Sequence, residues 1–135
     1  MREIKFRAWD NLLGFMGEVR NIDFVDKTIQ VLVEDNEGYY FKDWRLKEVK
    51  IMQFTGLQDC NGVDIYEGDI VEISQTSSKE QETYDSKSEV VFVDGAFKLV
   101  FYDLADEFYL DLKDSTIDYV EVIGNIYENP ELLEV

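Results

Sequence analysis

Histidine is absent from this chain of 135 residues, and cysteine and proline each occur once. Without histidine the chain lacks the commonest general base and transition-metal ligand, and it cannot form a Ser-His or Cys-His triad. The single cysteine, Cys60, allows neither an internal disulfide nor a cysteine-based metal cage. These absences exclude the commonest routes to acyl transfer and to transition-metal binding.

Long apolar runs are also missing. No stretch approaches the roughly 18–20 residues that span a bilayer, and the N-terminus lacks the basic and then apolar pattern of a signal peptide. Hydrophobic residues nevertheless make up 45% of the chain, a fraction too high for a disordered protein. We therefore expect a folded, cytoplasmic protein.

Positive charge is scarce, because 13 Lys and Arg face 30 Asp and Glu, for a net charge of −17. Residues 1–70 carry −5 of this charge and residues 71–135 carry −12. Such a surface repels phosphate backbones and anionic lipids, since nucleic-acid binding depends on Lys and Arg. The charge predicts no direct nucleic-acid or membrane partner, and it favours basic proteins or divalent cations.

Two-residue alternation of apolar and polar side chains runs through most of the sequence and is typical of β-strands. Asn61-Gly62 and Asp94-Gly95 are hairpin-turn signals flanked by such segments. The pattern predicts a mainly β fold with minor helix, either a small SH3-like barrel or a sandwich built from hairpins. Pro130 is suited to begin a short C-terminal helical turn.

Four segments are less regular. Residues 15–24 predict a strand with an irregularity at Gly17 or Asn21, and the second half of residues 46–54 favours a strand. Residues 76–88 have almost no apolar content and predict a long exposed loop. Residues 103–114 fit either a short acidic helix or an irregular connection.

Three blocks of sequence, REIKFRAWD, MQFTGLQDCNGVDIYEGDIV and VIGNIYENPELL, together resemble the YopX family of bacteriophage and prophage proteins. They occur in the family's order and span nearly the whole chain. The resemblance implies a phage-encoded cytosolic protein with a mainly β fold that self-associates, and it implies neither a reaction nor catalytic residues. We expect one domain over residues 1–135, or an N-terminal β subdomain (1–54) packed on a central and C-terminal β-barrel (55–135).

The carboxylate-rich stretch in the middle block allows two interpretations. Its oxygen-bearing side chains could form a calcium or magnesium loop, because hard cations prefer oxygen ligands: Asp59, Asn61, Asp64, Glu67 and Asp69. Apolar residues interrupt the EF-hand spacing, however, and Asn-Gly supplies the positive φ of a turn. We favour a scaffold role and predict that these side chains do not converge, so no metal, cofactor or catalytic residue is assigned.

An exposed tryptophan can anchor a protein interface, and both tryptophans lie in the less acidic half of the chain. We name Trp9, Trp44, Arg7 and Arg45 as interface candidates, although both tryptophans could instead cap the edges of a core. The interface would be apolar and aromatic.

The acidic side chains of residues 103–114 could imitate a phosphate backbone, or they could simply form a solvated face: Asp103, Asp106, Glu107, Asp111 and Asp114. The favoured function is an oligomeric protein-binding or assembly module that contacts itself or a basic host or phage protein. The alternatives are a carboxylate-based, metal-dependent enzyme and an acidic nucleic-acid mimic that blocks a host DNA-binding protein.

Overall fold

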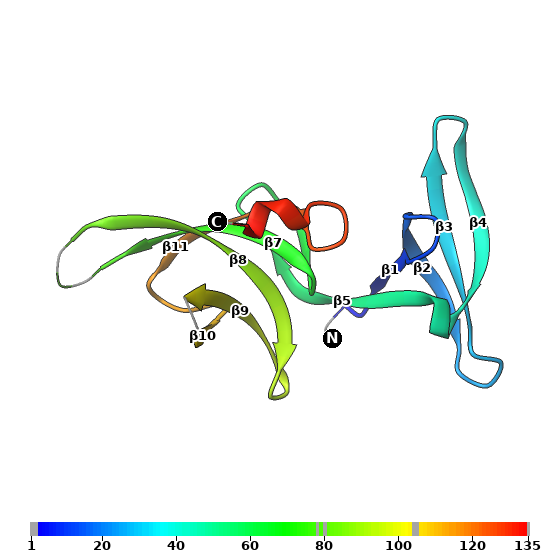
Figure 1. Cartoon of the computed structure of the whole chain (residues 1–135), viewed down its shortest axis with the longest axis horizontal. Helices are drawn as coiled ribbons and strands as arrows, with labels where there is room; N and C mark the ends of the chain where they lie inside the picture. The colour runs from blue at the N-terminus through cyan, green and yellow to red at the C-terminus, as the bar shows by residue number, and fades with distance from the viewer. Residues whose placement is uncertain (1–2, 78, 80, 104–105, 135) are drawn as a thin grey trace. The chain divides into compact units, whose positions relative to one another are not determined.

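The computed structural model describes residues 3–77, 79, 81–103 and 106–134. Within these residues the chain forms strands and two short 3-10 helices, which confirms the prediction of a mainly β protein with little helix (Figure 1). The elements in chain order are β1 (Phe6–Asp10), β2 (Met16–Asp23), β3 (Thr28–Asp35), β4 (Gly38–Arg45), η1 (Leu46–Glu48), β5 (Val49–Gln58), β6 (Asp64–Tyr66), β7 (Asp69–Thr76), β8 (Thr83–Val93), β9 (Ala96–Asp103), β10 (Asp106–Asp111), β11 (Ile117–Asn125) and η2 (Pro130–Leu133).

The chain divides into two compact units, residues 1–54 and residues 55–135. Each unit has its own cluster of buried hydrophobic side chains. Strand β5 belongs to both units, because it pairs with β1 in the first and continues to β6 in the second.

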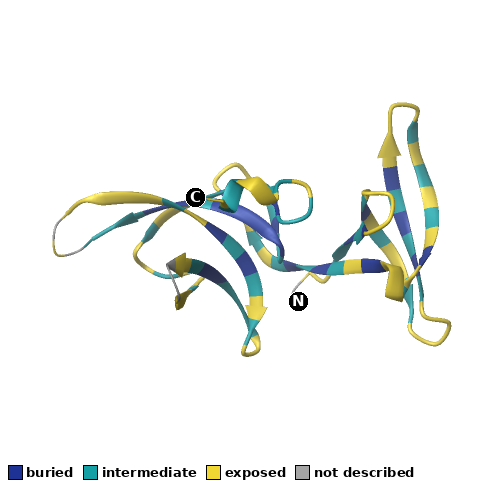
Figure 2. Cartoon of the chain, in the orientation of Figure 1, coloured by how far each residue is buried: buried dark blue, intermediate teal, exposed yellow. Residues whose placement is uncertain are grey.

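The first unit is an antiparallel sheet in the order β4-β3-β2-β1-β5. In β3, Ile29, Val31 and Val33 are buried and alternate with more exposed residues, so the strand presents one face to the core (Figure 2). Ala8 of β1 and Val49 of β5 belong to the same cluster, so the core extends across the strands of this sheet. Burying each of these valine and isoleucine side chains contributes about 1.5–3 kcal/mol.

The second unit is built on a five-stranded antiparallel sheet in the order β10-β9-β8-β7-β11. Its core contains Val71 and Ile73 of β7, Val90 of β8 and Leu99 of β9. Ile65 of β6 belongs to the same cluster, so the β5–β6 hairpin covers the inner face of this sheet. Helix η2 lies near β8 and begins with Pro130, which confirms the predicted C-terminal helical turn.

Both predicted hairpin turns are present. Asp94 and Gly95 join β8 to β9 with φ angles of 52° and 80°, as a tight two-residue turn requires. Asn61-Gly62 lies in the longer connection between β5 and β6, where Gly62 has a φ of 79°. The irregularity expected in residues 15–24 is a register shift between Val19 and Asn21.

The expectation of a closed SH3-like barrel is not met in the described residues. Strand β10 pairs only with β9 and β11 pairs only with β7, so the five-stranded sheet keeps two open edges. Closure would require hydrogen bonds between these edge strands, as in every β-barrel.

Two predicted connections are strands instead. Strand β8 begins at Thr83, opposite Thr76, so Thr76 and residues 83–88 of the expected loop are paired strand; residues 78 and 80 lie outside the described part of the chain. Residues 106–111 form β10, neither a helix nor an irregular connection, and residues 104 and 105 lie outside the described part of the chain. In both places backbone pairing with an adjacent strand decides the structure, over a polar composition in residues 83–88 and over a mixed spacing of apolar residues in 106–111.

Candidate functional site

Asp59 of the middle block accepts three backbone hydrogen bonds. It is buried at the start of the β5–β6 connection, where its Oδ1 accepts hydrogen bonds from the N–H groups of Asn61 (2.8 Å) and Val63 (2.9 Å). Its Oδ2 accepts a third bond, of 2.9 Å, from the N–H group of Val122 in β11. The backbone N–H of Cys60 donates to Val120 of the same strand, at 3.0 Å. Asp59 therefore fastens the β5–β6 hairpin to β11.

Electrostatics support this structural role. Burial raises the pKa of the Asp59 carboxyl, but the N–H groups of Val122, Val63 and Asn61 stabilise its charged form and together lower the pKa below its ordinary value of 3.8. A carboxylate that three backbone donors occupy in this way is a poor general base.

The other carboxylates of the block have separate partners. Asp69 is buried, and its Oδ2 accepts the N–H of Tyr66 at 2.8 Å, so it closes the tight turn between β6 and β7. Asp64 accepts a hydrogen bond of 3.1 Å from the side chain of Gln58. Within the described residues, no three His, Cys, Asp or Glu side chains are grouped to hold a metal ion. The geometry is that of a scaffold.

The C-terminal block has the same character. Asn125 is buried, and its Oδ1 accepts the N–H groups of Tyr127 (3.0 Å) and Glu128 (2.8 Å), which shapes the turn before η2. A Cβ on Gly124 would lie 2.6 Å from Oδ1 of Asn129, so only glycine fits there without a shift. Both blocks thus specify how connections pack onto the sheet of the second unit.

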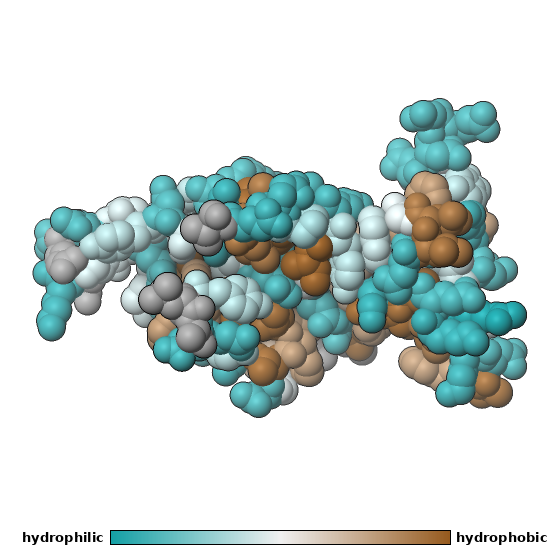
Figure 3. Space-filling model, in the orientation of Figure 1, coloured by the Kyte–Doolittle hydropathy of each residue, from teal (hydrophilic) through white to brown (hydrophobic). Residues whose placement is uncertain are grey.

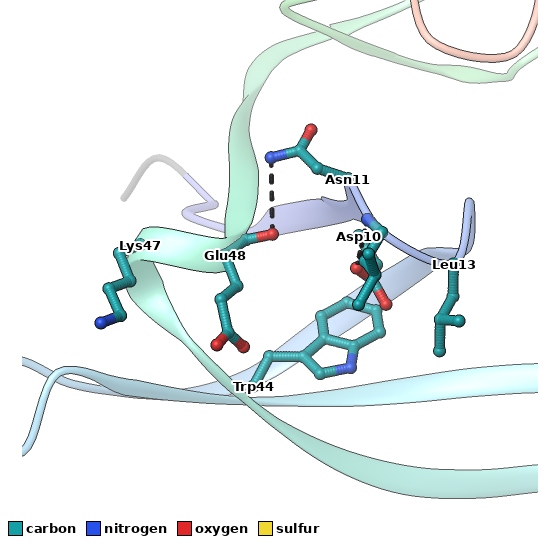
Figure 4. Close-up of a pocket in the computed structure, with 7 residues that line it drawn as sticks. Asp10, Asn11, Leu13, Trp44, Lys47 and Glu48 are labelled. Atoms are coloured by element: carbon teal, nitrogen blue, oxygen red, sulfur yellow. Dashed lines mark hydrogen bonds between the residues drawn. The ribbon is translucent and has the colours of Figure 1, made fainter.

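A different kind of feature lies in the first unit, where a pocket of about 480 Å³ opens beside Trp44 (Figure 4). The indole forms one wall, and helix η1 contributes Lys47 and Glu48. The side chain of Asn11 donates to the carbonyl of Glu48 at 3.4 Å, which connects the β1–β2 turn to η1. The residues lining the pocket are Asp10, Asn11, Leu12, Leu13, Trp44, Lys47 and Glu48.

Two hairpin tips of the first unit carry exposed apolar pairs. Leu12 and Leu13, beside the pocket, are 88% and 58% exposed. Phe24 and Val25, in the β2–β3 turn, are 76% and 90% exposed. Hydrophobic side chains accordingly reach the surface of this unit (brown in Figure 3). Turns ordinarily favour Gly, Asn, Asp, Ser and Pro. Two adjacent apolar residues in a turn are therefore a sequence signal for exposed apolar side chains, and the alternation pattern does not reveal it.

The aspartate before each tip explains why these apolar residues stay exposed. Oδ1 of Asp10 accepts the N–H of Leu12 at 2.9 Å. In the second tip, Oδ1 of Asp23 accepts the N–H groups of Val25 and Asp26, both at 2.9 Å. Such turns satisfy the backbone locally and leave the apolar side chains to project outward.

The four interface candidates are divided between the two faces of the first sheet. Trp44 is 9% exposed and belongs to the core, opposite Ile29, so only its edge reaches the pocket. Trp9 and Arg7 lie two residues apart on β1 and are half-buried, with Nε of Arg7 3.4 Å from Sδ of Met52. Arg45 is exposed at the end of β4. The candidates do not form one patch.

The acidic segment near β10 is likewise divided. Successive side chains of a strand alternate between faces, so Glu107 and Asp111 lie on one face of the sheet and Asp106 lies on the other. The side chain of Asp103 lies outside the described part, and Asp114 is in the turn after the strand. These acids do not make the single-faced array that a nucleic-acid mimic requires.

Tyrosines accompany the carboxylates on the outer face of β9 and β10. The hydroxyl of Tyr109 donates to Oε2 of Glu107 at 2.7 Å, and this bond is the main cause that raises the pKa of Tyr109. Burial raises the pKa of Tyr102, and the charges of Glu89 and Glu107 raise it further. Burial also raises the pKa of Glu89. The local potential is therefore negative.

Net charge differs sharply between the two units. The first unit contains nine Lys and Arg and ten Asp and Glu, a net charge of −1. The second unit contains four Lys and Arg and twenty Asp and Glu, a net charge of −16. Like-charge repulsion between copies therefore comes almost entirely from the second unit.

Comparisons with known proteins agree with this description. A family model described as YopX protein matches residues 5–134. The crystal structure of protein EF1440 from Enterococcus faecalis is similar, with 32% sequence identity and a TM-score of 0.65, over 99% of this chain and 100% of that chain. No curated protein matches the chain. No helix among the described residues is long and apolar enough to cross a membrane.

Proposed function

Since the chain belongs to the YopX protein family, we propose that it is a phage- or prophage-encoded accessory protein that works in the bacterial cytoplasm as an oligomeric protein-binding or assembly module. One observation carries the proposal: apolar side chains project from two hairpin tips of the first unit, and one tip borders the pocket beside Trp44. Exposed apolar side chains that lie together, as Leu12 and Leu13 do beside the pocket, mark protein contact sites.

The charge distribution favours a contact surface in the first unit. A surface of net charge −1 can approach a second copy without strong repulsion, whereas a surface of net charge −16 cannot. The apolar tips occur on the nearly neutral unit. Contact through Leu12, Leu13 and the edge of Trp44 would leave the acidic unit facing solvent.

The experiment measures the mass of the assembly by light scattering coupled to size exclusion. We expect the wild type to exceed the monomer mass and the double variant Leu12→Ser/Leu13→Ser to shift toward monomer. These positions are exposed and lie outside the core cluster, so the variant should remain folded. Trp44→Ala is a weaker test, because truncating a buried tryptophan costs about 3–5 kcal/mol of folding free energy.

Val63→Ser is the matched control. Val63 is also an exposed apolar residue in a hairpin connection, 48% exposed, but it lies in the second unit. It should leave the assembly mass unchanged. A wild type that stays monomeric at every concentration, or a control that dissociates as much as the Leu12/Leu13 variant, would show the proposal to be wrong.

A further inference from the structure

Strand β10 is an open edge of the second sheet. It pairs with β9 through residues 106–111, and no other strand among the described residues pairs with its far side. Asp106, Glu107, Phe108 and Tyr109 are all exposed, although they alternate between the two faces of the sheet. An edge of this kind offers unpaired N–H and C=O groups to another extended chain.

The two faces of β10 differ in chemistry. Glu107, Tyr109 and Asp111 lie on the outer face, whereas Phe108 and Leu110 lie on the face that continues the hydrophobic core. Phe108 is 53% exposed, so this end of the core is not fully covered. A strand added beside β10 would place its own alternate side chains against these two different rows.

From these observations we propose that β10 is a docking edge for an extended segment of another protein in which basic and apolar residues alternate. The basic side chains would lie beside Glu107, Tyr109 and Asp111, and the apolar ones would cover Phe108 and Leu110. Main-chain hydrogen bonds to the free edge would supply affinity, and the alternation would supply specificity. This surface belongs to the second unit, so the inference is independent of the proposed function.

Charge selects this occupant over a second copy of the chain. All three charged residues of β10 are acidic, and the unit around them has a net charge of −16. Pairing β10 with the β10 of another copy would bring Glu107 and Asp111 beside equal charges, which is destabilising in a sheet. The basic side chains of a cationic strand would instead lie beside the opposite charges of Glu107 and Asp111. The negative charge of the unit would also attract such a strand over a longer range.

The probe is an acetylated and amidated eight-residue peptide of alternating lysine and valine, titrated into the full chain at about 150 mM salt and followed by calorimetry. We expect binding at a ratio of one peptide per chain. Two further peptides carry N-methyl groups on the lysine amides or on the valine amides. Because only one of these two sets can face β10, at least one methylated peptide should lose its binding.

The test variant is Glu107→Gln/Asp111→Asn, which should weaken binding about fivefold or more, since exposed charge pairs contribute up to about 1 kcal/mol each. The matched control is Glu82→Gln/Asp85→Asn. It removes the same two charges from the same unit, and Glu82 also accepts a tyrosine hydroxyl, that of Tyr84 at 2.8 Å. The control should bind within about twofold of the wild type, because local contacts dominate over distant screened charges.

Three results would overturn the inference. The first is a wild type that does not bind the unmodified peptide at millimolar concentration. The second is undiminished binding of both methylated peptides, which would mean that charge alone holds the peptide. The third is equal weakening by the Glu107/Asp111 variant and its control, which would assign the attraction to net charge and not to β10.

Discussion

Replacing Asp59 by alanine should destabilise the second unit. The change removes a charged acceptor from three backbone N–H groups, those of Asn61, Val63 and Val122. Two of these donors lie in an exposed turn, where water can replace the carboxylate, whereas Val122 lies in β11 and is half-buried. Leaving the N–H of Val122 without an acceptor costs about 1–3 kcal/mol, and the solvated N–H groups of Asn61 and Val63 cost less. We therefore expect the free energy of unfolding to fall by about 3 kcal/mol.

The assay is equilibrium unfolding in urea followed by far-UV circular dichroism. Both tryptophans belong to the first unit, so their fluorescence does not report on the second. In a domain of this size 1 kcal/mol shifts Tm by about 4–8 °C, so a thermal scan should show a decrease of roughly 12–24 °C. A variant that unfolds within about 0.5 kcal/mol of the wild type would refute the role assigned to Asp59.

The pH dependence of stability provides a second test of the hydrogen bonds of Asp59. Because the folded-state pKa of Asp59 lies below its ordinary value of 3.8, its contribution is present above that value and is lost as pH falls through the folded pKa. The stability difference between the wild type and Asp59→Asn should therefore be constant from pH 7 to about pH 5 and shrink below about pH 4. Asp114→Ala is the control, since its carboxylate accepts only the N–H and hydroxyl of Thr116 in a solvated turn. It should lower stability far less.

Four further predictions follow from individual contacts. Gly124→Ala should cost about 1–3 kcal/mol, because a Cβ there meets the side chain of Asn129; a variant as stable as the wild type in urea would contradict this. Gly95→Ala should cost about 1–2 kcal/mol in the same assay, because its φ of 80° is left-handed. Exposed Cys60 should react with a thiol reagent in the folded protein without changing the assembly mass; protection of the thiol would contradict its exposure. Moderate salt should increase the assembly mass by screening the acidic unit, and an assembly that salt dissolves would show its contacts to be ionic.

Much of the fold could be predicted because strands and tight turns require particular patterns of neighbouring residues. The alternation in residues 28–33 follows from one buried face, and Asp94-Gly95 follows from the backbone angles of a tight turn. The connections were harder. Residues 83–88 are polar and the apolar residues around 106–111 fit no single period, yet both segments are strands, because hydrogen bonds to β7 and β9 stabilise them.

For the candidate sites too, the sequence predicted local features but not contacts between distant residues. Alternation indicated that the carboxylates of the middle block lie on different faces, and their hydrogen bonds come from different donors: backbone N–H groups for Asp59 and Asp69, and the side chain of Gln58 for Asp64. It did not indicate that Asp59 reaches β11, because that contact joins residues 63 positions apart. Nor did it indicate that Trp44 is a core residue whose edge borders a pocket, since this depends on how η1 and the β1–β2 turn meet.

The sequence by itself determined that the protein is mainly β, strongly acidic, without histidine and with a single cysteine. These properties depend on composition and on the spacing of neighbours, which the chain carries before it folds. Only the tertiary structure decided that β10 is an open edge among the described strands and that two apolar hairpin tips stay exposed. Each of these depends on which distant strands pair, and pairing between strands is a property of the whole sheet.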